Sequence, residues 1–201
     1  MITIIDYGMG NLGSIANMVK KVGGQSFITS DLNEIKKATK LILPGVGSFD
    51  NGMSKLRELD LIDILNKKVL EDKVPIMGIC LGMQLMTNFS EEGKLVGLGW
   101  IDAQSKKFVS DKLKIPHMGW NIIYQKKVSK LFDELTSEKR FYFVHSYCVS
   151  CNKEEDILTK TSYVHDFVSS FERENIIGVQ FHPEKSHKFG MALFKNFVEK
   201  Y

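Results

Sequence analysis

The sequence predicts an α/β fold in which a parallel β-sheet carries helices on both faces and continues into an antiparallel extension. In the first half of the chain, short apolar runs alternate with amphipathic stretches, an order that produces right-handed crossovers between parallel strands. After about residue 94, shorter segments with alternating or β-rich composition follow one another, which is typical of hairpins. Because no repeat or linker interrupts the 201 residues, we expect a single domain over 1–201.

Four strands and the helices between them are expected in the first half. Each expected strand is a short apolar run bounded by glycine, proline or polar residues. Asp31 follows Thr29 and Ser30, so it is expected to cap a short helix. The expected strands are Ile2–Asp6, Gln25–Thr29, Leu41–Leu43 and Pro75–Ile79, and the expected helices are Asn11–Val22, Leu59–Glu71 and a segment near Met83.

The second half is expected to supply the antiparallel strands and a final helix. Its segments are shorter and richer in β-branched and aromatic residues than those of the first half. We expect β-structure at Leu95–Ile101, Gly119–Tyr124, Phe141–Val149, Tyr163–Ser170 and Ile176–Phe181, and a helix at His187–Lys200.

The composition is that of an ordinary globular protein and argues against binding to nucleic acid or insertion into a membrane. Hydrophobic residues make up 43% and charged residues 25%, with a formal net charge of +3 and scattered lysines, so a nucleic-acid footprint is not expected. The N-terminus lacks a basic signal-peptide region, and no apolar run approaches the length of a membrane span. Three cysteines make an odd count without a disulfide framework, which favours a reducing, cytoplasmic setting.

The segment Gly78-Ile79-Cys80-Leu81-Gly82 has the pattern of a nucleophile elbow with a thiol in place of a hydroxyl. It joins the apolar run Pro75–Ile79 to a helix-like pattern, and its glycines allow a sharp turn and close packing of strand and helix. The turn would place Cys80 at a helix N-terminus, where thiolate is favoured over thiol. The alternative is a buried, inert cysteine, which is a common fate of free thiols.

Two further segments complete a catalytic pattern. His182 and Glu184 follow an apolar strand and supply a base and a carboxylate that orients it, the partners that a cysteine nucleophile needs. The glycine-flanked loop Pro44-Gly45-Val46-Gly47 follows another strand, and the ends of parallel strands meet at one sheet edge. Its N–H groups, with the N–H of Leu81, could stabilise an oxyanion. Alternatively, the loop is a plain turn and His182 is a strand-end histidine bonded to backbone.

Further motifs offer competing interpretations. Gly8-Met9-Gly10-Asn11-Leu12-Gly13 matches the G-x-G-x-x-G dinucleotide-binding pattern, with Asp31 as the candidate ribose ligand, although a tight turn is favoured because Asp31 better fits a helix cap. Cys148-Val149-Ser150-Cys151 is one C-x-x-C pair, an incomplete ligand set for zinc. His182, Glu184 and His187 could also suggest a metal site, but the triad explains them with fewer assumptions. No metal or cofactor is expected.

Taken together, these motifs resemble those of class I (triad) glutamine amidotransferases, over essentially the whole chain. The resemblance implies a flavodoxin-like amidotransferase fold. Within this class, the chain resembles most specifically the glutaminase subunit of imidazole glycerol phosphate synthase, which is the HisH family. The residues that carry the narrower resemblance are Asp6-Tyr7-Gly8-Met9-Gly10-Asn11, Pro116-His117-Met118-Gly119-Trp120-Asn121, Tyr142-Phe143-Val144-His145-Ser146-Tyr147 and His182-Pro183-Glu184-Lys185-Ser186.

The resemblance implies hydrolysis of L-glutamine to glutamate and ammonia. Cys80 would attack the side-chain amide, His182 would transfer protons, and Glu184 would hold His182. Val46 and Leu81 would form the oxyanion hole, in a loop that reorients in the family. The positions that match glutamine-holding residues are Gly45, Gly47, Gln84, Glu92, Ser146 and Tyr147.

The resemblance also implies a partner: a (βα)₈-barrel cyclase of the HisF type, bound as a heterodimer, that uses the ammonia to make imidazole glycerol phosphate and AICAR in histidine biosynthesis. Positions of that interface are Asn11, Met118, Trp120 and Lys185. Glutaminase activity is therefore expected to be low without the partner. The same chemistry could serve a different synthase, such as a sugar-amidinating enzyme. The motifs also leave open a cysteine hydrolase of the same fold and a nucleotide-binding protein without enzymatic activity.

Overall fold

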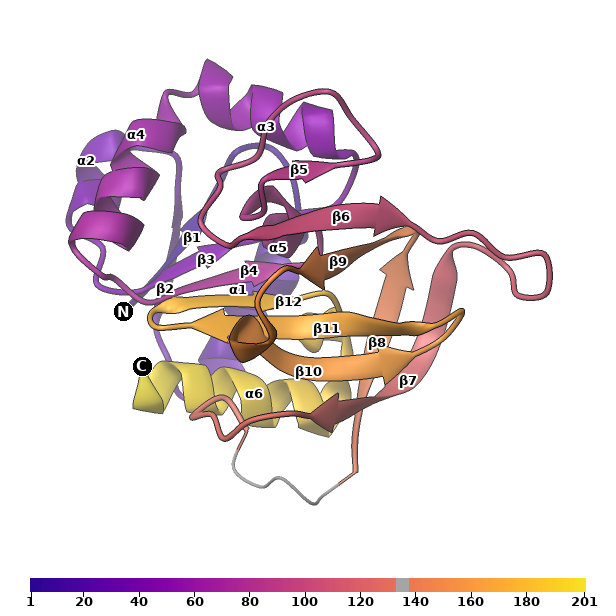
Figure 1. Ribbon diagram of the computed structural model, residues 1–201. Helices are drawn as coiled ribbons and strands as arrows, with labels where there is room; N and C mark the ends of the chain where they lie inside the picture. Colours follow the sequence, from indigo (N-terminus) through magenta and orange to yellow (C-terminus); the bar gives the residue numbers. More distant parts are fainter. Residues whose placement is uncertain (133–137) are drawn as a thin grey trace.

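The computed structural model describes residues 1–132 and 138–201, which form a central β-sheet with helices packed on both of its faces (Figure 1). Twelve strands of the described residues belong to this sheet, and its main path runs β2-β1-β3-β4-β12-β11-β10-β7-β8. The predicted α/β class is confirmed, with a parallel half and an antiparallel extension.

The parallel half contains the first four strands and the last one. β1 lies between β2 and β3, and β4 lies between β3 and β12, with all four pairings parallel. The C-terminal ends of β3, β4 and β12 therefore meet at one edge of the sheet. The strands are β1 (Ile2–Ile5), β2 (Ser26–Thr29), β3 (Leu41–Leu43), β4 (Ile76–Ile79) and β12 (Ile176–Val179).

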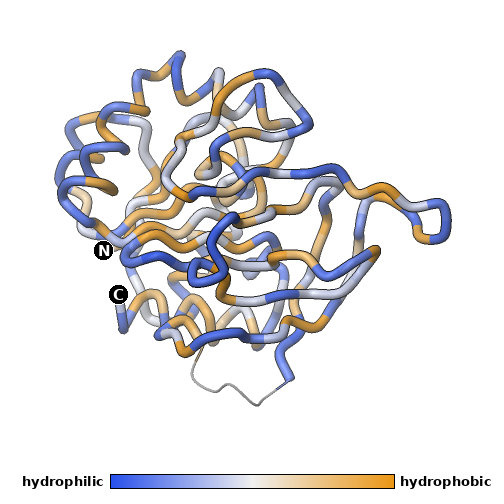
Figure 2. Tube along the Cα trace, viewed as in Figure 1, coloured by the Kyte–Doolittle hydropathy of each residue, from blue (hydrophilic) through white to orange (hydrophobic). Residues whose placement is uncertain are grey.

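Helices cover the two faces because successive side chains of these strands point in opposite directions. Ile4 and Met77 pack with the first and last helices, whereas Ile5 and Ile76 pack with the helices of the other face. The apolar strands lie in the middle of the molecule, and polar segments surround them (Figure 2). One face carries α1 (Leu12–Lys21) and α6 (His187–Lys200), the other α2 (Leu32–Lys36), α3 (Phe49–Glu58) and α4 (Leu61–Asn66), and α5 (Leu81–Leu85) follows β4.

The antiparallel extension begins where β11 pairs with β12. From there β10, β7 and β8 continue antiparallel, while β9 joins β11 to β6. The strands are β5 (Phe89–Ser90), β6 (Ala103–Lys107), β7 (His117–Gln125), β8 (Lys139–His145), β9 (Tyr147–Cys151), β10 (Ile157–Ser162) and β11 (Asp166–Arg173).

Several predicted elements differ from the structure. The segment Leu95–Ile101 is not a strand, because the carboxylate of Asp50 accepts hydrogen bonds from the backbone N–H groups of Lys94 and Leu95 and holds the segment as a loop. The single strand predicted over Phe141–Val149 is two strands, β8 and β9, which separate at Ser146. The predicted segment Tyr163–Ser170 begins in the turn that precedes β11, and helix α3 was not predicted.

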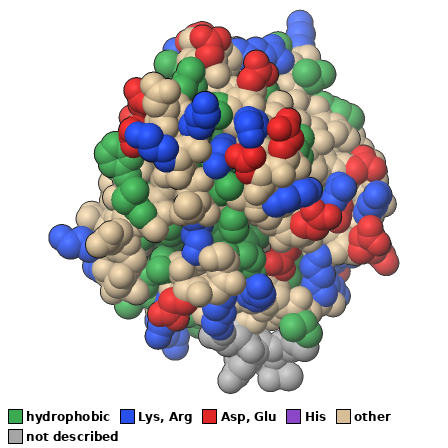
Figure 3. Space-filling view, turned by 90° about the vertical axis from the view of Figure 1, so that its left-hand side faces the viewer, with side chains coloured by type: hydrophobic (Ala, Val, Ile, Leu, Met, Phe, Trp, Pro, Cys, Tyr) green, Lys and Arg blue, Asp and Glu red, His purple; other side chains and the backbone are tan. Residues whose placement is uncertain are grey.

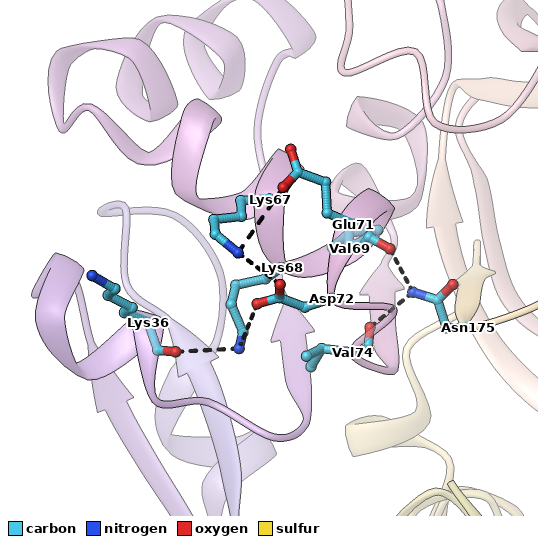
Figure 4. Close-up of polar contacts among 8 residues, drawn as sticks. All are labelled: Lys36, Lys67, Lys68, Val69, Glu71, Asp72, Val74 and Asn175. Atoms are coloured by element: carbon cyan, nitrogen blue, oxygen red, sulfur yellow. Dashed lines mark hydrogen bonds and ion pairs between the residues drawn. The ribbon is translucent and has the colours of Figure 1, made fainter.

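The helix predicted over Leu59–Glu71 is also divided. It begins at Leu61, after Asp60 in a left-handed conformation, and its last part, Lys67–Glu71, is a π-helical turn. The buried Lys68 ammonium bonds the carbonyl of Lys36 and pairs with Asp72, at 3.2 Å each (Figure 4).

Asn175 ties this turn to the start of β12. Its amide donates to the carbonyls of Val69 and Val74, at 2.9 Å each (Figure 4). These contacts fix the N-terminal end of β4, at the end of the sheet opposite to Cys80.

The surface at that end of the molecule is charged but mixed. Basic and acidic side chains alternate on it around smaller hydrophobic areas (Figure 3). A face of this kind lacks the one-sign patch that marks nucleic-acid binding. Among the described residues, no helix combines the length and the hydrophobicity that crossing a membrane requires.

Candidate active site

The elbow at Cys80 has the strained geometry that the motif predicts. Cys80 adopts φ 54° and ψ −108°, which is unusual for a residue with a side chain, and it immediately precedes α5. A Cβ atom added to Gly82 would lie 1.9 Å from the carbonyl oxygen of Leu43, and one added to Gly78 would lie 2.8 Å from the backbone of Gly82. Both glycines are therefore required for α5 to pack this closely.

The histidine and the carboxylate lie just after the neighbouring strand, β12, at the same edge of the sheet. β12 pairs in parallel with β4, with Val179 opposite Ile79, so the segment after Val179 passes beside Cys80. Nδ1 of His182 lies 2.8 Å from Oε1 of Glu184, and the two side chains are 2% and 1% exposed. The backbone N–H of His182 donates to the carbonyl of Tyr142 at 2.8 Å, which holds the segment against β8.

The electrostatics of the site favour a charged imidazole. Burial lowers the pKa of His182, but the nearby Cys80 sulfur and the Glu184 carboxylate outweigh burial and raise the pKa to about 10. The Nε2 atom of His182 is buried and has no hydrogen-bond partner among the described residues. The imidazole of His182 is thus charged at neutral pH, and its Nε2 atom is available for proton transfer.

A cavity of about 340 Å³ opens over these groups. Its size is within the range of small-molecule sites. Nine of the residues expected in the site line it: Val46, Gly47, Cys80, Leu81, Gln84, Glu92, Ser146, Tyr147 and His182. The glycine-rich loop, the elbow and the histidine therefore converge on one space.

Two expected residues lie behind the cavity wall. Glu184 contacts the cavity only through His182. Gly45 is packed so closely that an added Cβ atom would lie 2.7 Å from the hydroxyl of Tyr7 and 2.8 Å from the backbone nitrogen of Gly82. Gly45 thus allows the loop to approach the start of α5.

Two of the polar wall residues already have protein partners. The Nε2 atom of Gln84 donates both hydrogens, to the carbonyl of Tyr147 (3.2 Å) and to Oε1 of Gln180 (3.0 Å). Oε1 is thus the only atom of its amide left for a ligand. Glu92 accepts the N–H of Phe49 at 2.8 Å, which attaches the wall to the start of α3.

The residues expected at a partner interface lie outside the cavity. Asn11, Met118, Trp120 and Lys185 are all exposed. Met118 and Trp120 project from the same face of β7, and the Trp120 ring stacks on His187 with centroids 5.5 Å apart. None of the four positions lines the cavity.

The sequence is similar to those of known proteins over nearly the whole chain, and the fold is shared with solved structures. A profile described as "Glutamine amidotransferase class-I" matches residues 3–201. A protein of Methanococcus maripaludis, named imidazole glycerol phosphate synthase subunit HisH 2, is 60% identical over 201 residues, which is 100% of each chain. One of Pseudomonas aeruginosa with the same name is 48% identical over 200 residues, 99% of each chain. The chain belongs to the class-I glutamine amidotransferase family.

Solved structures of amidotransferases share the fold. One, titled as a glutamine amidotransferase, has a TM-score of 0.78 at 15% identity and covers 99% of this chain and 98% of its own. The structure of PurLQS from Thermotoga maritima has a TM-score of 0.77 at 16% identity, with 98% and 96% covered. At these identities the likeness concerns the fold alone.

The competing motifs of this amidotransferase have structural explanations. Asp31 caps α2 by accepting the N–H groups of Asn33 and Glu34, as expected. Gly10 has φ 109°, and an added Cβ atom would lie 2.9 Å from the Cβ of Pro44. Gly10 therefore serves a tight turn against the loop that lines the cavity.

The C-x-x-C pair does not form a joint site. Cys148 and Cys151 are three residues apart on β9, so their side chains point to opposite faces, and they belong to different apolar clusters. Burial raises the pKa of each thiol to about 12. Within residues 1–132 and 138–201, no three His, Cys, Asp or Glu side chains are grouped as metal ligands.

Several cavity residues of the amidotransferase were not predicted. Pro116, Val144 and His145 line the cavity, and Gln180 lies beneath it with its Nε2 atom 3.7 Å from the Cys80 sulfur. The only sequence signal for Gln180 is a polar residue at the end of an apolar strand, next to the His182 segment.

Proposed function

We propose that this chain acts as one amidotransferase domain that hydrolyses the side-chain amide of L-glutamine to glutamate and ammonia. The observation that carries the proposal is the convergence of a strained Cys80 and the buried His182–Glu184 pair on one cavity. Membership of the class-I glutamine amidotransferase family supports it.

The chemistry follows from the arrangement of these groups. The thiolate of Cys80 attacks the amide carbon and forms a C–S bond. The C–N bond then breaks, and Nε2 of His182 gives its proton to the departing nitrogen to release ammonia. Water attacks the resulting thioester, His182 takes a proton from the water, and the C–S bond breaks to release glutamate and the thiolate. The Glu184 carboxylate holds the imidazole throughout.

The walls of the cavity supply candidate roles for the remaining residues. The N–H groups of Val46 and Leu81 stabilise the oxyanion, and Gln84, Glu92, Ser146 and Tyr147 hold the glutamine backbone, together with Gly45 and Gly47. The position of the last two in a loop that passes over α5 supports this assignment.

We propose that the ammonia passes to a partner subunit rather than to solvent. Relatives of this chain are named as subunits of imidazole glycerol phosphate synthase, which supports a barrel cyclase of the HisF type as the partner and histidine biosynthesis as the pathway. The alternative acceptor is a different synthase, such as a sugar-amidinating enzyme. Two relatives carry the numbered name HisH 2, which indicates more than one subunit of this type in an organism. This numbering supports a different synthase as the second candidate acceptor.

Labelling with 6-diazo-5-oxo-norleucine, a glutamine analogue, tests the glutaminase proposal. We expect one adduct, which peptide mass spectrometry locates on Cys80, because only this thiol opens on the cavity beside a proton-transfer histidine. The variant Cys148→Ser, matched in chemistry but at a thiol that does not line the cavity, is expected to label at the wild-type rate, whereas Cys80→Ser is expected not to label. Adducts on Cys148 or Cys151, or none at all, would contradict the proposal.

A further inference from the structure

The sulfur of Cys80 has a polar neighbour that the proposed hydrolysis does not use. Nε2 of Gln180 lies 3.7 Å from Sγ, and the Gln180 side chain is fully buried. On another side, Sγ lies 3.9 Å from the carbonyl oxygen of Val144. A carbonyl can accept a hydrogen from the thiol but repels the thiolate. Apart from the His182 imidazole, whose pKa the sulfur raises, the polar neighbour that can stabilise the thiolate is therefore Gln180 rather than Val144.

The orientation of the Gln180 amide is fixed by the groups behind it. The carbonyl of Tyr147 can only accept hydrogen bonds, so the atom of Gln84 that faces it at 3.2 Å is the nitrogen. The same nitrogen lies 3.0 Å from the Gln180 amide, which therefore presents its oxygen to Gln84. Its nitrogen, with two hydrogens, is then left to face the sulfur.

Two buried histidines secure the Tyr147 carbonyl from its other side. Nδ1 of His145 lies 2.8 Å from this carbonyl and must donate to it, so Nε2 of the neutral ring accepts a hydrogen from His117 at 2.9 Å. Burial lowers the pKa of His117 to about 4 and that of His145 to about 3, so both rings are neutral at pH 7. Both lone pairs of the carbonyl are thereby occupied.

We infer that Gln180 is a positioning residue which, held by Gln84 and the carbonyl of Tyr147, presents an amide N–H to the Cys80 sulfur and favours its thiolate. The inference rests on the proposed role of Cys80 as the nucleophile. Hydrogen bonds to charged groups are stronger than those between neutral groups, so the contact strengthens when the thiol loses its proton.

The test is the pH dependence of alkylation of Cys80 by iodoacetamide, followed by peptide mass spectrometry. Gln180→Met keeps a side chain of similar length but removes the donor, and we expect the midpoint of the alkylation profile to move up by about one pH unit. Gln84→Met leaves Gln180 in place without its anchor and is expected to give a smaller shift in the same direction. It also tests the inference if Gln180→Met does not fold.

The matched control is Gln125→Met, the same substitution at the opposite end of β7 from His117, and it is expected to titrate like the wild type. Wild-type midpoints in both Gln180→Met and Gln84→Met, or an equal shift in Gln125→Met, would overturn the inference. Alkylation by iodoacetamide reports the protonation state of the Cys80 sulfur and does not require glutaminase activity. The glutaminase proposal is tested separately by labelling with the glutamine analogue, so the failure of one can be distinguished from the failure of the other.

Discussion

At the scale of single residues, the site contains a buried positive charge on the imidazole of His182. The pKa of His182 is lowered by burial but raised more strongly by Cys80 and Glu184, to about 10, well above the ordinary value near 6.5. Between these two values the folded chain binds a proton that the unfolded chain releases. The resulting contribution to stability is complete below about pH 6.5 and is lost as the pH rises toward 10.

This linkage predicts the behaviour of Glu184→Gln. Removing the carboxylate from the imidazolium should lower the free energy of unfolding by about 2 kcal/mol at pH 6, because a charge-assisted hydrogen bond is lost inside the protein. The difference from wild type should shrink as the pH rises toward and through 10, because above this pH His182 is neutral in both proteins. Urea unfolding at several pH values measures it.

The control for this experiment is Glu174→Gln, which breaks an exposed ion pair with Lys73. Exposed pairs contribute little, so no change in stability is expected at any of these pH values. A constant difference between Glu184→Gln and wild type from pH 6 to pH 10 would show that His182 is not charged in the folded protein.

Residues whose roles depend on local motifs could be predicted from the sequence, whereas those that depend on distant contacts could not. The elbow at Cys80 and the His182–Glu184 pair are each contained in one short segment. Gln180 is 100 positions from Cys80, and only the pairing of β4 with β12 brings them together. Likewise, Asp50 determines the loop at Lys94 and Leu95 from 44 or 45 positions away, against the β-like pattern of that loop.

At the scale of secondary-structure elements, the approach of helix α5 to strand β3 determines where the elbow can form. Helix α5 is only five residues long and begins directly above the end of β3. Its second residue, Gly82, lies where any side chain would overlap the Leu43 carbonyl, as the 1.9 Å contact of an added Cβ atom shows. Most helix positions do not have this constraint.

Two glycine-to-alanine substitutions should therefore have opposite effects. Gly82→Ala should destabilise the protein by about 3 kcal/mol or more, because backbone must move to admit the methyl group. Gly13→Ala, at the second residue of α1 where an added Cβ atom meets nothing within 4 Å, should stabilise it by about 0.5 kcal/mol. Thermal unfolding of both variants measures the contrast. Equal effects would refute the close approach of α5 to β3.

At the scale of the whole molecule, β7 has two faces with different environments. His117 and Asn121 face inward, where the Asn121 amide nitrogen lies 3.2 Å from Nε2 of His117 and extends the polar contacts behind the cavity wall. Met118 and Trp120 face outward and are 61% and 45% exposed. An aromatic and a flexible apolar side chain exposed together are typical of protein–protein interfaces.

If the exposed face of β7 binds the partner, Trp120→Ala should weaken the complex with the barrel cyclase subunit of the same organism by about 30-fold, the loss typical of a central tryptophan. Tyr124→Ala is the matched control, because Tyr124 is also an exposed aromatic residue of β7 but lies near its other end. It should bind like the wild type. Calorimetric titration gives the dissociation constants. Glutaminase assays give a second measurement, because the free subunit is expected to have low activity. In these assays, Trp120→Ala should require more cyclase than the wild type to reach the activated rate. Identical dissociation constants for the two variants would place the interface elsewhere. No binding of the cyclase by wild-type protein would instead favour the second synthase as the acceptor.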